Sequence, residues 1–112
     1  MEFKDGVYKE VLAVVAGNET VVKPTVEIET AMDVADALSN AIAGKDIVVT
    51  AILDGKHKTG SKHYEGNAFD MRIWIYSKSE LSTLVSNLRG NLGIDYDIVL
   101  HETHLHIEYD PK

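Results

Sequence analysis

The chain has 112 residues, a formal net charge of -7 at pH 7 and no cysteine. This length is enough for one domain with a single hydrophobic core and too short for two. Without cysteine there can be no disulfide framework and no thiolate zinc finger, so any metal must be bound by imidazole and carboxylate groups. The acidic charge disfavours nucleic acid as a partner, because phosphate binding depends on clustered Lys and Arg.

The beginning of the chain, Met1-Glu2-Phe3-Lys4, lacks the basic and apolar regions of a signal peptide. No later apolar run approaches the roughly 20 residues of a membrane span. We therefore expect a protein that is cytoplasmic where it is made and that does not bind membrane.

Two short strands are predicted in the N-terminal region, at residues 11–16 and 21–26. The turn-like sequence Gly17-Asn18-Glu19 separates them. Pro24 lies in the second strand and favours an edge position, because proline cannot donate a ladder hydrogen bond.

A helix and a buried strand are predicted next. Thr30 is the candidate N-cap, with Asp33 three residues later, and apolar residues recur at helical spacing until Gly44. The β-branched run at residues 46–53 predicts a buried strand that ends at Asp54-Gly55.

The middle of the chain predicts a loop, a strand and a second helix. Residues 56–67 are polar and form the loop, and residues 68–76 return to β-favouring types, so that Asp70 opens a strand. Ser77-Lys78-Ser79-Glu80 fits a capping box, and an apolar stripe then continues to Gly90.

Two strands close the chain, at about residues 96–100 and 104–109. They are joined by a tight connection at His101-Glu102-Thr103. Helices separated by antiparallel-looking strands predict an α+β fold, a small antiparallel or mixed sheet with two main helices, in one domain over residues 1–112.

Histidine and carboxylate residues are grouped in two segments, Ser61 to Asp70 and Glu102 to His106. One His and one carboxylate from the first segment, with at least one His from the second, supply the three ligands that a catalytic zinc takes while a fourth position stays open. Glu102 is then available as a base that need not touch the metal. Imidazole suits copper, iron and nickel as well as zinc, so the residue types alone leave the metal open.

A histidine in a strand is more often hydrogen-bonded than metal-bound, and here the grouping favours a site. Side chains alternate between faces of a strand, so Glu102, His104, His106 and Glu108 share one face if the extended backbone reaches back to Glu102. Neighbours on that face lie about 6.5 to 7 Å apart, so one can bind a metal while the next meets substrate.

The first segment resembles a known signature. Its residues match the pattern Ser-x-His-x-x-Gly-x-Ala-x-Asp at Ser61, His63, Gly66, Ala68 and Asp70. This pattern is typical of the zinc D-alanyl-D-alanine carboxypeptidase family, which includes vancomycin-resistance dipeptidases, bacteriophage L-alanyl-D-glutamate endolysins and, more distantly, the amino-terminal domain of hedgehog proteins. The order of elements over roughly residues 30–109 is similar, and His104-Leu105-His106 resembles the His-x-His that completes the metal site in part of the family.

This resemblance implies one Zn²⁺ per chain, bound by His63, Asp70 and His106, with His104 contacting substrate or a ligand. It also implies a catalytic glutamate, for which Glu102 is the candidate because Glu108 lies beyond the last ligand. Many members place this glutamate three residues before the last ligand, whereas Glu102 stands four before His106.

Other residues have two interpretations each. The Ser61 hydroxyl either hydrogen-bonds a ligand carboxylate or is an ordinary loop donor; Gly66 either lets backbone pass close to the metal or serves a turn. Trp74 lines a substrate groove or lies in the core. The family commonly supplies a cationic side chain that binds the reacting carbonyl or a carboxylate. The candidates for it are His57, Lys58 and Lys62.

The implied function is hydrolysis of a short bacterial cell-wall peptide, at a D-Ala-D-Ala terminus or an L-Ala-D-Glu bond, with Glu102 as the general base. Another factor would then release the protein to the cell wall. Two alternatives stay open. One is a non-catalytic module in which His63, Asp70, His104 and His106 all bind zinc; the other is a phage structural or accessory protein that keeps the fold without activity.

Overall fold

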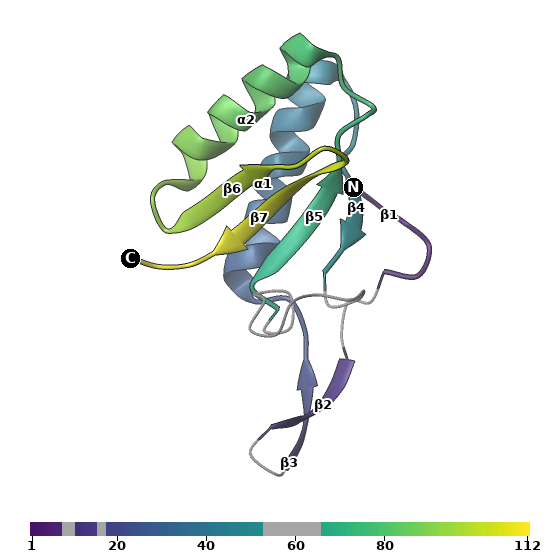
Figure 1. Cartoon of the computed structure of the whole chain (residues 1–112), viewed down its shortest axis with the longest axis vertical. Coiled ribbons are helices and arrows are strands. Elements are labelled where there is room, and N and C mark those ends of the chain that lie inside the picture. The colour runs from purple at the N-terminus through teal and green to yellow at the C-terminus, as the bar shows by residue number, and fades with distance from the viewer. Residues whose placement is uncertain (8–10, 16–17, 53–65) are drawn as a thin grey trace.

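The computed structural model describes residues 1–7, 11–15, 18–52 and 66–112. These residues form a five-stranded mixed sheet, a separate two-stranded sheet and two helices (Figure 1). The predicted α+β class is therefore confirmed. Neither of the helices in the described part of the chain is both long and apolar enough to cross a membrane.

The elements follow one another along the chain as β1 (Glu2–Phe3), β2 (Val11–Val15), β3 (Asn18–Val22), α1 (Val26–Ala43), β4 (Val48–Ala51), β5 (Ala68–Arg72), α2 (Lys78–Leu92), β6 (Tyr96–Leu100) and β7 (His104–Tyr109). The large sheet has the strand order β1-β4-β5-β7-β6. Its pairs are antiparallel except for β1 and β4, which run parallel.

The two N-terminal strands pair with each other as a hairpin, which projects away from the large sheet in Figure 1. The second of them begins at Asn18, earlier than predicted, and ends at Val22. Pro24 therefore lies outside it, directly before the helix. The pairing of β1 with β4 is a feature that the sequence did not predict.

Helix α1 begins at Val26, about one turn earlier than predicted from Thr30. Its N-cap is Thr25, whose side-chain oxygen accepts a hydrogen bond from the Ile28 amide at 3.3 Å. The alternation Val26-Glu27-Ile28 is strand-like in sequence, which hid this first turn. Ile28 is fully buried, and packing of that side chain decides the helical conformation.

Both helices have identifiable ends. Gly44 caps α1 as predicted, with a φ of 66° that favours glycine. The predicted capping box of α2 is confirmed, with Ser77 and Glu80 each accepting a hydrogen bond from the other's amide. The same helix passes through Gly90, where we expected it to end, and stops before Gly93.

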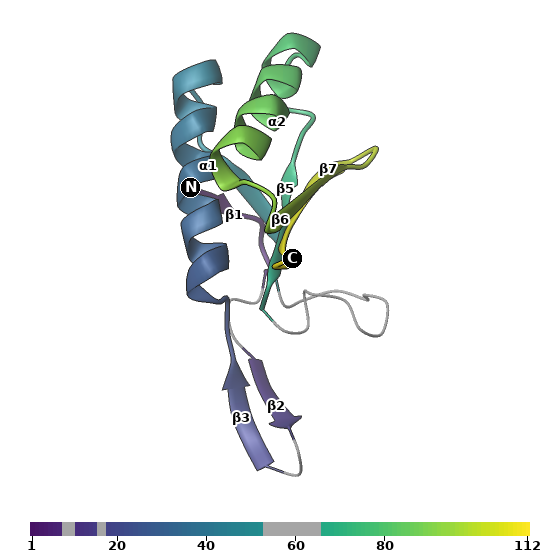
Figure 2. The ribbon, with the colours of Figure 1, turned by 90° about the vertical axis from the view of Figure 1, so that its left-hand side faces the viewer.

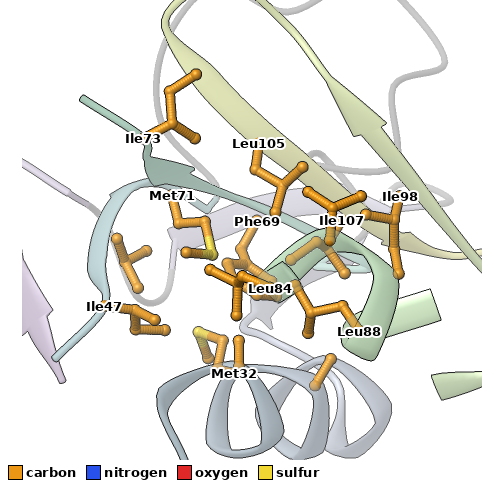
Figure 3. Packing of buried hydrophobic residues seen from close by; sticks show 14 of the residues in the cluster. Met32, Ile47, Phe69, Met71, Ile73, Leu84, Leu88, Ile98, Leu105 and Ile107 are labelled. Atoms are coloured by element: carbon orange, nitrogen blue, oxygen red, sulfur yellow. The ribbon is translucent and has the colours of Figure 1, made fainter. Parts of the chain in front are cut away.

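Both helices pack on one face of the sheet (Figure 2), and the hydrophobic core lies between them and the strands (Figure 3). The central strands supply Phe69, Met71, Leu105 and Ile107, all fully buried. Because side chains alternate along a strand, the residues between these point to the face that the helices do not cover. That face holds the residues of the candidate site.

Candidate metal site

Asp70 of β5 and His106 of β7 are direct partners across two paired strands. The Asp70 Oδ1 and His106 Nδ1 atoms lie 2.8 Å apart. Asp70 is only 8% exposed, and a carboxylate this buried needs a charged or hydrogen-bonding partner. The buried neighbours Phe69 and Ile107, which pair next to them on the core side, determine this register.

Glu108 contacts the opposite edge of the same ring. Its Oε1 atom lies 2.8 Å from His106 Nε2, so both ring nitrogens face a carboxylate. Burial lowers the pKa of His106, but its hydrogen bonds to Asp70 and Glu108 together outweigh burial, and the pKa is raised above the usual value of 6.5. When the ring is protonated, it can donate one hydrogen bond to each carboxylate.

This arrangement suits a zinc ion between Asp70 and His106. When Nε2–H donates to Glu108, the Nδ1 lone pair is left for a metal on the side where Asp70 lies. Two ligand atoms at about 2.0 Å from a tetrahedral zinc are about 3.3 Å apart. The observed separation of 2.8 Å would have to open only slightly, so these two side chains fit adjacent ligands.

Two further imidazoles lie beside this pair. His104 Nε2 is 3.8 Å from Asp70 Oδ2, and its Nδ1 is 3.1 Å from the Thr103 hydroxyl. The His101 ring stacks on the His104 ring with centroids 4.7 Å apart, and its centroid is 6.3 Å from that of His106. Three imidazoles and a buried carboxylate therefore gather around the start of β7, and the sequence had not indicated that His101 would join them.

Glu102, the predicted base, lies exposed in the turn between β6 and β7. Regular pairing of β7 begins at His104, and the His101 amide bonds the His104 carbonyl across the turn at 2.9 Å. The strand alternation that we considered therefore covers His104, His106 and Glu108 and does not reach Glu102. Its role as a base stays a prediction.

The first half of the signature lies outside the described residues. This applies to the predicted ligand His63 and to the predicted substrate or positioning residues His57, Lys58, Ser61 and Lys62, which stay predictions. Gly66 is described and has a φ of 75°. A side chain there would collide with the Lys23 carbonyl, and the Gly66 carbonyl accepts a hydrogen bond from the Thr25 amide at 3.0 Å. Glycine is required at position 66 because the backbone there passes close to the segment that leads into α1.

Trp74 is 71% exposed, so the interpretation that places it in the core is wrong. The Arg72 guanidinium lies 4.7 Å from the centre of its ring, within the range of a cation–π contact. Arg72 is the cross-strand partner of His104 and shares the face of Asp70.

Elsewhere in the described part of the chain, three carboxylates lie close enough together to hold a metal ion. Asp97, Glu108 and Asp110 offer oxygen atoms that all lie within 4.8 Å of one another. The Lys112 ammonium is 3.2 Å from Asp97 and 3.4 Å from Asp110, and it neutralises part of their charge. The sequence did not predict this cluster, because the cluster depends on the pairing of Asp97 with Glu108 across β6 and β7.

Comparisons with known proteins add no family to this description. No protein-family model matches the chain, and no curated protein matches it significantly. Asp70, His104, His106 and Glu108 are brought together by their own contacts, and these contacts make the group a candidate metal site.

Proposed function

We propose that this chain is a zinc-dependent peptidase that cleaves short peptides of the bacterial cell wall. The observation that carries the proposal is the 2.8 Å contact between Asp70 and His106. It joins the last residue of the signature pattern to the last residue of the His-x-His segment, 36 positions later in the chain. The resemblance to the D-Ala-D-Ala peptidases and L-Ala-D-Glu endolysins supplies the substrate class and the expected hedgehog-like fold.

His63, Asp70 and His106 would hold the zinc ion, and Glu108 would orient the ring of His106 through its Nε2–H. When bound, zinc lowers the pKa of a coordinated water to about 7 and polarises a carbonyl. Two imidazoles and one carboxylate are a ligand set of the kind that catalytic zinc sites use.

Glu102 would act as the general base. It is exposed in the turn that leads into His104. It would take a proton from the attacking water and return it to the leaving amine, a role typically worth about 10² to 10⁴-fold in rate. His104, two residues away, would contact the substrate.

The test combines zinc content with product analysis. The purified protein should contain about one zinc per chain. Mass spectrometry should detect cleavage of a peptide ending in D-Ala-D-Ala or of one containing an L-Ala-D-Glu bond. Glu102→Gln should keep the zinc and lose at least about 10²-fold in rate, because the amide cannot accept the proton. Full zinc occupancy without cleavage of either peptide would contradict the proposal.

One observation favours a second candidate, a zinc module without catalysis. His104 Nε2 lies 3.8 Å from Asp70 Oδ2, so His104 is an immediate neighbour of a proposed ligand and is the candidate for a fourth ligand. A site with four protein ligands has no open position for water and is structural. In that case His104→Ala would weaken zinc binding as much as His106→Ala does, whereas a peptidase site would lose zinc only in the second variant.

A further inference from the structure

Strand β6 forms one edge of the large sheet, and α2 runs alongside it (Figures 1 and 2). The Asp110 amide donates a hydrogen bond to the Asp95 carbonyl, and the His101 amide donates one to the His104 carbonyl. The backbone N–H and C=O groups of the odd-numbered residues from 95 to 101 therefore point toward β7. The peptide groups of Ile98 and Leu100 therefore point outward, away from the sheet. A bond from Arg89 Nη2 to the Ile98 carbonyl, at 3.0 Å, agrees with this orientation.

A groove of about 520 Å³ lies between this edge and α2. Its walls are formed by one side of the helix and one residue of the strand, and they include Lys78, Leu81, Ser82, Val85, Arg89 and Leu100. Leu100 is 49% exposed, which is unusual for a leucine whose strand neighbours Ile98 and Leu105 are buried. The groove thus has an apolar floor beside a row of outward-pointing backbone groups.

The two ends of the groove carry positive charge in a chain whose net charge is -7. Lys78 stands at the first turn of α2 and Arg89 at the last. Arg89 uses one donor on the Ile98 carbonyl, and a guanidinium has five, so others can bind a carboxylate. The charges favour an acidic partner.

We propose that this groove binds an extended, acidic peptide segment of another protein, which adds to β6 as a further strand. Its backbone would pair with Leu100 and with the Ile98 amide, because the Ile98 carbonyl already accepts a hydrogen bond from Arg89. An apolar side chain would rest on Leu81, Val85 and Leu100. Carboxylates near its ends would pair with Lys78 and Arg89. This surface is separate from the proposed metal site, which lies on the face of the sheet that the helices leave open.

The dimensions fit such a segment. From residue 78 to residue 89 a helix rises about 16 Å. An extended chain covers this length with about five residues. A second copy of the chain is a poorer occupant than an acidic peptide, because a symmetric edge-to-edge pair would bring Lys78 of one copy near Arg89 of the other, and these charges repel.

The probe is a fluorescent peptide, Glu-Val-Thr-Val-Glu, compared with Lys-Val-Thr-Val-Lys and with the first peptide N-methylated at its central amides. Fluorescence anisotropy should detect binding of the acidic peptide only, weakened at high salt, where charge screening is strong. In NMR spectra of the labelled protein, the amides of Ile98 and Leu100 should shift, and the ring signals of His106 should not.

Three variants locate the contact. Lys78→Glu and Arg89→Glu should each weaken binding at least about tenfold by reversing a paired charge. Lys78→Glu places an acid in the first turn of α2, where it is compatible with the helix dipole, so this variant should fold normally. Leu100→Glu should also weaken binding, whereas Ile94→Glu, the same change at a residue that is 79% exposed outside the groove, should not.

Four results would overturn the proposal. They are equal binding of the lysine-ended peptide, equal binding of the N-methylated peptide, amide shifts away from β6 and α2, and no binding at peptide concentrations up to about 1 mM. A dimer seen by sedimentation and dissociated by Leu100→Glu would assign the edge to self-association instead.

Discussion

The two faces of strands β5 and β7 differ completely in chemistry although they share one backbone. One face carries Phe69 and Ile107, which are fully buried beneath the helices. The other carries Asp70 and His106, which hydrogen-bond each other. Because one register determines both, apolar packing on the first face positions the polar pair on the second. Packing of the hydrophobic core therefore also positions two of the proposed metal ligands.

Breaking the apolar face should have the largest effect. Phe69→Ala should lower the free energy of unfolding by about 3 to 5 kcal/mol, because it removes a fully buried aromatic ring and leaves a cavity. Urea denaturation of the metal-free protein measures this loss. Ile94→Ala, at a residue that is 79% exposed, is the control and should change stability by less than about 0.5 kcal/mol. Equal stability of both variants would show that the core is not where this structure places it.

Substitutions on the polar face should remove the metal. His106→Ala and Asp70→Ala should each weaken zinc binding by more than the 10- to 100-fold that is typical of losing an outer-sphere partner. Competition with a chromophoric chelator measures the affinity. His63→Ala should behave in the same way, and His104→Ala should keep most of the affinity. Loss of zinc in His104→Ala with retention in His106→Ala would reverse the ligand assignment.

Glu108 provides a further test of the polar face, because it hydrogen-bonds His106 but is not one of the proposed ligands. Glu108→Gln should weaken zinc binding by about 10- to 100-fold, since the amide is a poorer acceptor for Nε2–H. Glu108 also belongs to the acidic cluster, so Asp97→Asn is the matched control and should leave zinc affinity unchanged. A larger loss in Asp97→Asn than in Glu108→Gln would place the metal in the acidic cluster.

The smallest expected effect is a pH dependence of the metal-free protein. The pKa of His106 is raised above its unfolded value of 6.5, so its contribution to stability is fully present below about pH 6.5 and is lost as the pH rises through the folded-state pKa. Wild type should therefore lose more stability than His106→Gln between about pH 6 and pH 8. Urea denaturation in the presence of a chelator measures both slopes. Parallel slopes would mean that the ring is not held between two carboxylates.

The parts of the fold that local signals determine were predictable. The capping box at Ser77, the glycine that ends α1 and the bounds of β6 and β7 were all predicted correctly, because each depends on residues within a few positions. The start of α1 was missed, because burial of Ile28 overrides a strand-like alternation. Strand β1 was missed because only its pairing with β4, far along the chain, defines it.

The candidate site was predictable in its residue types and not in its contacts. Resemblance alone related Asp70 to His106, since cross-strand register depends on packing of residues distant in sequence. Glu108 was set aside because it follows the last ligand, although its position two residues along the same strand face is the signal that places it on the ring. The gathering of His101 with His104 follows from the shape of the turn.

The imidazole nitrogen resonances of His106 test the central claim most directly, namely that Asp70 and His106 are two ligands of a zinc site. Long-range proton–nitrogen NMR spectra distinguish a protonated from a metal-bound ring nitrogen. When zinc is added to the metal-free protein, His106 Nδ1 should become metal-bound while Nε2 keeps the proton that it donates to Glu108. An unchanged His106 ring at full zinc occupancy, or zinc on Nε2, would contradict the account.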